Sequence, residues 1–443
     1  MSDSSTVTRR RVAAWLETDR GAALATFGAA LVVYALTASW TRIHNSDVYA
    51  SVVPAIQAAQ TGTVWLEGTP WADTSPFFDR VGDHVVSNRQ VGIIMLAVPF
   101  YALFGAPDDV WPSVLAVVVA AAGTVTMLHL AIRRHVTPAA GWAATAVLAF
   151  GTPTWAVSAD GLWSHTATQL AIAAAAVALA RDRWWLAGAA LGAGTLARPH
   201  LAVIALVVGL GMSWSRRNPR IAIAVGVPAT LGLASLVGLN RWIYGRWTVS
   251  AYKSYATDNL AGGFGEWYDP LLNVAGFLIA PDRGLFIWTP IALVLLPAVW
   301  RIRGSAPTWT IWLTVGGLAY TAVQLRINHF HGVDAFFGYR HPLELVTCAF
   351  ALYAVAWSSV RSARLRGVVA SLAVLQIAAM ALGAVRSEGL LEVDEVWRDN
   401  SLLVVLRMEP LVMAPLMLVI LALAVRIGLD VYRRSASASE NQR

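Results

Sequence analysis

The chain has 443 residues, of which 57% are hydrophobic and only 13% are charged. Soluble globular domains carry about 25% charged residues, and the mean hydropathy of +0.57 excludes that class. The formal net charge of +7 would favour a nucleic-acid partner in a soluble protein, but in a membrane protein Lys and Arg first report topology. The single cysteine, Cys348, excludes a disulfide framework. We therefore expect a polytopic membrane protein that binds no nucleic acid.

The first apolar run covers residues 21–40 and follows a basic tail that contains Arg9, Arg10, Arg11 and Arg20. A cleaved signal peptide has a shorter apolar core and ends in a small-residue cleavage site. We therefore expect an uncleaved anchor, preceded by a cytoplasmic tail at residues 1–20.

Asp47 lies a few residues beyond this run, where the hydrocarbon core of a membrane gives way to water. Apolar residues then recur at helical spacing, at Val48, Val52, Ala55, Ile56 and Ala59. This pattern predicts a short helix along the membrane surface with Asp47 in its N-terminal turn. Asp47 is our candidate catalytic residue. The alternative is that it only caps the helix, because Asp is a favoured N-cap residue.

Apolar runs recur along the rest of the chain and predict an all-α, polytopic transmembrane helix bundle of about twelve spans. The expected spans are residues 22–41, 111–132, 137–157, 162–180, 184–197, 199–214, 221–242, 284–300, 307–325, 342–359, 367–385 and 411–426. Two of these, 184–197 and 199–214, are short for a hydrocarbon core about 30 Å thick. They form either two spans or a re-entrant hairpin around Arg198.

The basic residues decide the topology, because Lys and Arg near span ends collect on the cytoplasmic side. The short run 91–104, with Pro99 inside it, can either span or lie on the surface. If it spans, Arg133 and Arg134 fall outside; if it does not, every basic connection falls inside. We therefore expect residues 42–110 to form one long external loop with two juxtamembrane helices.

This topology predicts one transmembrane domain at residues 21–432 of a multi-pass plasma-membrane protein. Both termini are then cytoplasmic, with a C-terminal tail at residues 433–443. The cytoplasmic loops are short and basic, whereas polar and aromatic residues gather in the segments expected outside. Those segments are residues 42–110, 160–165, 244–255, 281–290 and 328–342. We expect the functional site on the external face.

Several of these segments resemble those of the GT-C membrane glycosyltransferases, which use polyprenyl-phosphate sugars. An acid just after the first span and before a surface helix, here Asp47, is the hallmark of that superfamily. Residues 88–105 are similar to the Pro- and Gly-rich segment that precedes the second span in bacterial members. Residues 281–290 and 337–340 are similar to segments of the branch related to protein O-mannosyltransferases. The resemblance covers most of the chain and implies a polyprenyl-phosphate-sugar-dependent glycosyltransferase.

The chain departs from that pattern beside the first acid. Many members carry a second acid there, whereas Asp47 is followed by Val48 and Tyr49. A divalent metal is therefore possible but not supported by a paired acid, and we expect no other cofactor. We also expect the loops alone to recognise the acceptor.

The expected reaction transfers a sugar from a lipid phosphate to a hydroxyl group. It needs a base to take the hydroxyl proton and cations to hold the phosphate as its negative charge grows. Asp47 is the expected base, with a pKa raised by partial burial, and direct displacement predicts inversion at the anomeric carbon. Arg198, Lys253, Arg283 and Arg340 are suitable phosphate donors. The lipid tail would enter laterally between spans.

The full set of expected substrate-binding residues comprises His44, Arg89, His165, Arg198, Lys253, Asp282, Arg283, Arg340 and His341. Each has an alternative reading. Asp282 and Arg283 can form a local ion pair, Arg340 can extend to the membrane interface, and the histidines can be structural. The spacing of His329, His331 and Asp334 suits a metal, although interfacial histidines more often bond loop backbone.

The Ala- and Arg-rich composition is typical of a high-GC bacterium, where mannose or arabinose on a polyprenyl phosphate would be natural donors. The acceptor is a glycan, a glycolipid or a protein hydroxyl. Two other classes stay open: a lipid or sugar transporter or flippase, and a non-catalytic membrane scaffold. A transporter would carry ionisable groups or broken helices at corresponding places in two repeated halves, and the sequence has no such pairing.

Overall fold

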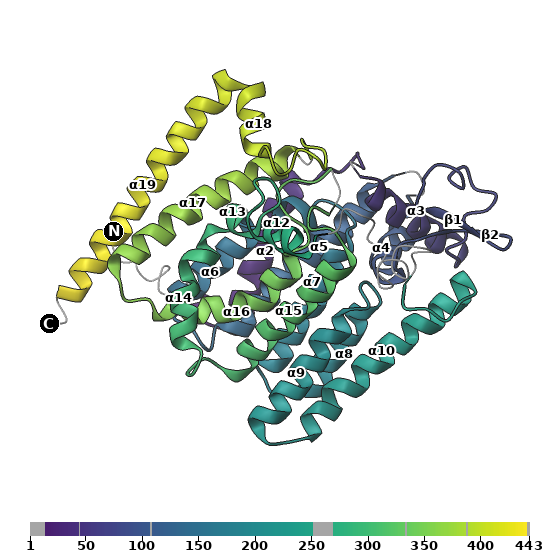
Figure 1. Ribbon diagram of the computed structural model, residues 1–443, viewed down its shortest axis with the longest axis horizontal. Helices are drawn as coiled ribbons and strands as arrows, with labels where there is room; N and C mark the ends of the chain where they lie inside the picture. The colour runs from purple at the N-terminus through teal and green to yellow at the C-terminus, as the bar shows by residue number, and fades with distance from the viewer. Residues whose placement is uncertain are drawn as a thin grey trace, which may run out of the picture.

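The computed structural model describes residues 14–43, 45–106, 109–250, 269–332, 335–386 and 389–440. The described chain is an all-α bundle with one two-stranded hairpin, β1 (Phe78–Val81) and β2 (His84–Ser87). Figure 1 shows the helices packed side by side over most of the molecule, with the hairpin at one end. The predicted fold class, a polytopic helix bundle, is confirmed.

Each expected span overlaps a helix of the described chain. These helices are α2 (Asp19–Thr37), α5 (Trp111–Ile132), α6 (Pro138–Phe150), α7 (Ser164–Leu179), α8 (Trp184–Thr195), α9 (Leu201–Arg216), α10 (Arg220–Tyr244), α14 (Pro290–Ile302), α15 (Thr308–Ile327), α16 (Leu343–Ser359), α17 (Ala363–Arg386) and α19 (Pro410–Glu440). In the described residues, five helices are long and apolar enough to cross a membrane: α2, α5, α10, α17 and α19. The number of spans stays a prediction.

Two helices break where proline removes a backbone donor or clashes with the preceding turn. The expected span 137–157 ends as a regular helix at Phe150, and a π-type turn, η1 (Thr154–Ser158), follows Pro153. The expected span 284–300 is divided into α13 (Leu285–Trp288) and α14, which begins at Pro290.

The first long loop contains the two predicted juxtamembrane helices, α3 (Ser46–Thr61) and α4 (Val91–Phe104), which pack against each other. Between them lies the antiparallel hairpin, in which Phe78 pairs with Ser87 and Val81 with His84. Its two-residue turn has Gly82 at φ +61°, a conformation that favours glycine. The hairpin was not predicted.

The start of α4 is fixed against the connection between α8 and α9. The backbone N–H of Gly92 donates to the carbonyl of Leu196 at 2.9 Å. A Cβ atom on Gly92 would lie 2.4 Å from the backbone nitrogen of Ala197, so only glycine permits this approach. The contact places the start of α4 beside the connection that carries Arg198.

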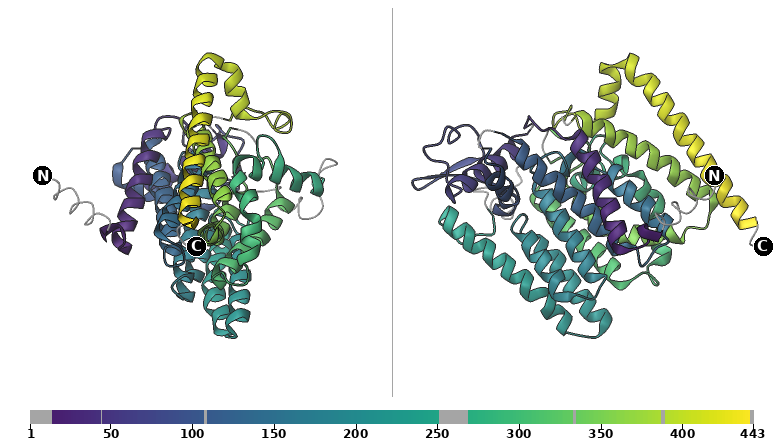
Figure 2. Two further views of the ribbon diagram at one scale, coloured as in Figure 1. Left: turned by 90° about the vertical axis from the view of Figure 1, so that its left-hand side faces the viewer. Right: turned by 180° about the vertical axis from the view of Figure 1, so that it is seen from behind.

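Two short helices, α12 (Pro270–Ile279) and α18 (Ser401–Met408), complete the described chain together with α19. Figures 1 and 2 show α19 at the edge of the molecule, beside α17. The two helices meet through small residues, since Ser371 Oγ donates to the carbonyl of Ala424 at 2.9 Å and Gly367 faces Gly428.

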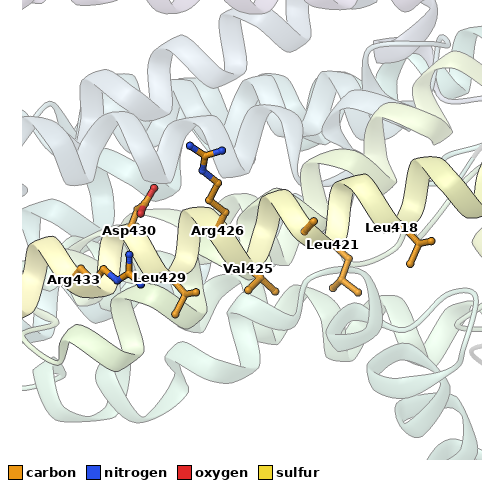
Figure 3. A pocket seen from close by; sticks show the side chains of 8 residues that line it. Leu418, Leu421, Val425, Arg426, Leu429, Asp430 and Arg433 are labelled. Carbon is orange, nitrogen blue, oxygen red and sulfur yellow. The ribbon is translucent and has the colours of Figure 1, made fainter.

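The outer surface of α19 is apolar. Figure 3 shows leucine and valine side chains along one side of the helix and Arg426 and Asp430 leaving from the other. The exposed leucines and valines include Leu411, Leu418, Val419 and Val425. Such a surface suits contact with lipid chains.

Candidate active site

Asp47 lies in the first turn of α3, as predicted, but it is not the cap of that helix. Asn45 is the N-cap residue, and its side-chain oxygen accepts from the backbone N–H of Asp47 at 2.6 Å. The alternative that Asp47 serves only as the N-cap is therefore wrong. Its carboxylate is available for other partners.

Those partners are two arginines from distant parts of the chain. Arg89 Nη1 lies 2.9 Å from one carboxylate oxygen of Asp47, and Arg340 Nη1 lies 2.7 Å from the other. The side chains are largely but not fully covered, with exposed fractions of 18% for Asp47, 10% for Arg89 and 9% for Arg340. Charge-assisted bonds of this length are strong and directional.

The arginines reverse the expected pKa shift of Asp47. Burial raises the pKa, but the positive charges of Arg340 and Arg89, with a smaller contribution from Arg198, outweigh it and hold the pKa below its usual value. The prediction of a raised pKa was wrong because it considered burial without the arginines. Asp47 is ionised at neutral pH.

The loop before α4 is tied to both α3 and α10, which places Arg89. Ser87 Oγ donates to the carbonyl of Ala50 at 2.6 Å, and the Tyr244 hydroxyl donates to the carbonyls of Ser87 and Arg89 at 2.7 and 3.3 Å. Each of these bonds satisfies a buried backbone acceptor. The position of Arg89 is therefore set by backbone contacts as well as by its own side chain.

Arg340 lies against aromatic rings. Its Cζ atom is 4.8 Å from the ring centroid of Trp163 and 5.3 Å from that of Phe336, which is favourable for a cation. Gly161 allows α3 to approach the ring of Trp163, because a Cβ atom on residue 161 would lie 3.0 Å from Val48 Cγ2 and 2.9 Å from Trp163 Nε1.

Arg198 and His165 lie together near Asp47, and their expected role in substrate binding stays a prediction. Arg198 lies in the connection between α8 and α9, and its Nη2 is 2.8 Å from His165 Nε2. On its other side, His165 Nδ1 lies 2.9 Å from Glu344 Oε1. Glu344 is fully buried in the first turn of α16. We call Asp47, Arg89, His165, Arg198, Arg340 and Glu344 the Asp47 cluster.

His341 adjoins this cluster. Its ring centroid is 6.1 Å from that of His165, and Gly332 (φ +66°) packs against it and Arg340. Burial, with help from Arg340 and Arg198, lowers the pKa of His341 well below its usual value. His341 is therefore neutral at pH 7.

Asp282 and Arg283 do not contact Asp47. They form an ion pair of 2.9 Å with exposed fractions of 0% and 1%. Arg283 Nη1 also donates to the carbonyls of Phe336 and Gly338 at 3.0 and 2.9 Å, and Asp282 Oδ1 accepts from the backbone N–H of Ser401 at 2.7 Å. This arrangement is the predicted alternative, a local ion pair, and it ties three segments together.

The remaining predicted residues are less informative. His44, Lys253 and Asp334 lie outside the described residues. His329 and His331 have stacked rings with centroids 5.3 Å apart. In the described parts of the chain, no group of three or more His, Cys, Asp or Glu residues is arranged to hold a metal ion, and the metal site stays a prediction.

The donor set at Asp47 does not fit a divalent cation. Such a cation needs free carboxylate oxygens and several oxygen ligands, whereas each oxygen of Asp47 faces a guanidinium group.

Sequence reasoning missed Glu344, although a signal was present. Glu344 is an acid inside an expected membrane span, residues 342–359, and an ionisable residue in that position is a functional candidate by default. Asn45 was missed as well, because the favoured N-cap residue type was assigned to its neighbour Asp47.

No known family model matches this sequence, and no curated protein does either. Among solved structures, the fold is similar to the Archaeoglobus fulgidus oligosaccharyltransferase tethered with an acceptor peptide, at 12% sequence identity and a TM-score of 0.48. The match covers 85% of this chain and 56% of that protein. The chain thus spans little more than half the length of the protein it matches.

Proposed function

We propose that this protein is a membrane glycosyltransferase that transfers a sugar, of the mannose or arabinose class, from a polyprenyl-phosphate donor to an acceptor hydroxyl. The observation that supports this best is Asp47, an ionised carboxylate at the start of a helix in the first long loop, held by Arg89 and Arg340 with Arg198 nearby. A base and phosphate-binding cations are the two groups that this reaction needs.

The charge of the Asp47 cluster favours an anionic ligand. Three guanidinium groups in it, from Arg89, Arg198 and Arg340, face two carboxylates, from Asp47 and Glu344. Among these groups of the described chain the arginines outnumber the carboxylates, and their side chains are mostly removed from water. A sugar phosphodiester carries one negative charge and suits such a group of arginines.

Buried polar atoms beside Asp47 support the same kind of ligand. Arg340 Nε and His341 Nδ1 are among the buried side-chain atoms of the described residues that have no hydrogen-bond partner. An unpaired buried polar group costs about 1–3 kcal/mol. A substrate with phosphate and hydroxyl oxygens supplies acceptors and donors of the required kind.

Asp47 acts as the base after an exchange of partners. When the phosphate arrives, Arg340 and Arg89 turn part of their donors towards it, which frees a carboxylate oxygen and lets the pKa of Asp47 rise. Asp47 then takes the proton of the acceptor hydroxyl while the hydroxyl oxygen attacks the anomeric carbon. The bond from that carbon to the phosphate oxygen breaks, and the configuration inverts.

The phosphate leaves with the bonding electron pair and needs no proton. As a monoester it carries a charge of about −1.5 to −2 at pH 7, so its charge grows during the step. Arginine forks are suited to hold that growing charge, and donors already in place contribute most. Arg89, Arg198 and Arg340 have this role.

The membrane arrangement is part of the proposal. Residues 21–432 form one transmembrane domain, the site lies on the external face of the plasma membrane, and both termini are cytoplasmic, because basic residues gather in the opposite loops. The lipid tail of the donor enters from the side, between apolar helices, and a glycan, glycolipid or protein presents the acceptor hydroxyl.

The test is sugar transfer by the purified protein in lipid vesicles, supplied with radiolabelled polyprenyl-phosphate mannose or arabinose and a membrane extract as acceptor. The wild type is compared with Asp47→Asn, which keeps the size of the side chain and removes the base. We expect transfer to fall by about 1,000-fold. Asp73→Asn, an exposed acid in the same loop, is the matched control and should keep wild-type transfer.

The outcomes separate the alternatives. Equal transfer by the wild type and Asp47→Asn would remove Asp47 from the mechanism. Absence of transfer from every donor, with binding of the donor intact, would favour the transporter or scaffold readings over an enzyme.

A further inference from the structure

Glu344 is a charged residue that no part of the mechanism above uses. Its exposed fraction is 0%, and its carboxylate accepts hydrogen bonds from Thr168 Oγ1 at 2.7 Å and from His165 Nδ1 at 2.9 Å. A buried carboxylate is costly unless it is paired. A neutral residue at position 344 would avoid this cost, so the charge of Glu344 calls for an explanation.

The hydrogen bonds determine the tautomer of His165. A guanidinium group has donors only, so Nε2 of His165 must accept from Arg198 Nη2, at 2.8 Å. The proton of the neutral ring is then on Nδ1, from which it donates to Glu344. A continuous chain runs from the carboxylate of Glu344 through His165 to the guanidinium of Arg198.

Arg198 has several further partners. Besides His165, its Nε donates to Ser164 Oγ at 2.9 Å, and its Nη1 donates to Gln324 Oε1 at 2.9 Å and to the Tyr320 hydroxyl at 3.3 Å. Glu344 also acts on it directly, with Oε1 3.8 Å from Nε. The Arg198 side chain is 14% exposed, and its charge lies close enough to Asp47 to contribute to the lowered pKa of that residue.

We propose that Glu344 is the positioning residue for Arg198, and that through His165 it holds the guanidinium in the orientation that binds the phosphate of the lipid-linked sugar donor. The inference rests on the proposed function. A donor group that is already oriented loses less conformational entropy on binding. Glu344 does not touch the substrate and is therefore not a catalytic residue.

A neighbouring network indicates that the charge has a role beyond packing. Gln169 Nε2 donates to Thr347 Oγ1 at 2.8 Å and to Thr154 Oγ1 at 3.1 Å, and its Oε1 accepts from Ser158 at 2.5 Å. This network joins the same helices, α7 and α16, and uses neutral groups alone. Helix contact thus needs no carboxylate here, whereas Arg198 requires a counter-charge.

The experiment measures donor and acceptor kinetics of Glu344→Gln, which keeps the shape of the side chain and an acceptor oxygen for His165. We expect the KM for the polyprenyl-phosphate sugar to rise about tenfold and the KM for the acceptor to stay unchanged. Arg198→Ala should give a loss at least as large. The double variant should be no worse than Arg198→Ala alone, because both changes remove one contact to the phosphate.

Thr347→Val is the matched control. Thr347 is fully buried on α16, less than one turn beyond Glu344, and contacts Gln169 rather than Arg198. Its donor KM should equal that of the wild type. If Glu344→Gln does not fold, Thr168→Val replaces it, since it removes one bond to Glu344 and keeps every charge. Its donor KM should rise about threefold.

The failures are distinguishable. The inference would be overturned if the donor KM were unchanged in Glu344→Gln, or in Thr168→Val where that variant is used. The proposed function would still stand in that case, provided that the wild type transfers sugar and Asp47→Asn does not. Additive losses in the double variant, or an equal loss in Thr347→Val, would also overturn it. A wild type that transfers no sugar would instead refute the proposed function on which the inference rests.

Discussion

Two Asp–Arg pairs of this protein, one buried and one partly exposed, share one aromatic ring, that of Phe336. The Cζ atom of Arg283 lies 4.1 Å from the ring centroid and that of Arg340 lies 5.3 Å from it. The first arginine is paired with Asp282 and the second with Asp47. From the sequence, Asp47 was predicted as the catalytic base and Arg340, Asp282 and Arg283 as substrate-binding residues, but the surroundings of the two pairs differ.

The Asp282 pair is formed by adjacent residues, is neutral, and is 0% and 1% exposed. Its further bonds go to backbone atoms of Phe336, Gly338 and Ser401. The Asp47 cluster draws its charges from distant segments, contains more arginines than carboxylates, and leaves Asp47 18% exposed. We infer that the Asp282–Arg283 pair, whose other bonds go to the backbone, stabilises the fold. We propose that the Asp47 cluster, with its more numerous arginines near water, binds a ligand.

The largest expected effect is on folding, from Arg283→Met. The change leaves Asp282 as a buried charge without its partner and removes two bonds to backbone carbonyls. Breaking a buried pair in this way costs about 3–5 kcal/mol. We expect a much lower unfolding temperature, measured by tryptophan fluorescence, and poor yield. An unchanged unfolding temperature with a raised donor KM would instead make Arg283 a phosphate ligand.

The next effect is on catalysis, from Arg340→Lys. Lysine keeps the charge but loses the planar fork that reaches both Asp47 and a phosphate. We expect kcat/KM for the donor to fall by about 100-fold with little change in unfolding temperature. Arg246→Lys, at an exposed arginine, is the control and should leave transfer unchanged. Full activity of Arg340→Lys would mean that only its charge is used.

A smaller effect concerns the arginines of the Asp47 cluster. Decyl phosphate, an amphiphilic phosphate monoester, should raise the unfolding temperature of the wild type, since ligand at 100 times its Kd stabilises by about 2.7 kcal/mol. Arg89→Gln removes one positive charge from the Asp47 cluster, and the stabilisation should shrink to a fraction of that value. If decyl phosphate raised the unfolding temperature of Arg89→Gln as much as that of the wild type, the Asp47 cluster would not be the phosphate site.

The smallest effect is the pH dependence of transfer. The pKa of Asp47 is lowered, so its ionised form, and the stability that it contributes, are present at neutral pH and lost only as pH falls through the folded-state pKa. We expect kcat/KM to stay level down to about pH 4, the usual pKa of aspartate. Arg89→Gln removes a positive charge and should move the acid limb to higher pH. A limb above pH 6 in the wild type would contradict this assignment.

The helices could be predicted from the sequence because long apolar runs in a membrane have few alternatives to helix. The hairpin was missed since it depends on a two-residue turn at Gly82 rather than on a long pattern. The position of Asp47 in the first turn of a helix could be predicted from its place after the first apolar run. Its partners Arg89 and Arg340 were predicted only as members of a wider set, because tertiary packing alone decides which distant residues meet.

The remaining misses have local causes. The direction of the pKa shift of Asp47 required knowledge of its ion pairs, which no spacing in the sequence contains. Arg283 and Arg340 both lie in segments that the sequence predicts as external loops. Only their burial and their bonds to the backbone distinguish the two arginines, and neither can be read from the sequence. Glu344 alone could have been found, as an acid inside an apolar span.

The most direct test of this comparison measures unfolding temperature and sugar transfer per folded molecule for Asp47→Asn and Asp282→Asn side by side. We predict that Asp47→Asn unfolds close to the wild-type temperature and transfers about 1,000-fold less sugar. Asp282→Asn should unfold at a clearly lower temperature, while its remaining folded molecules transfer sugar at the wild-type rate. The reverse pattern, with Asp47→Asn active and Asp282→Asn stable but inactive, would contradict the assignment of the active site.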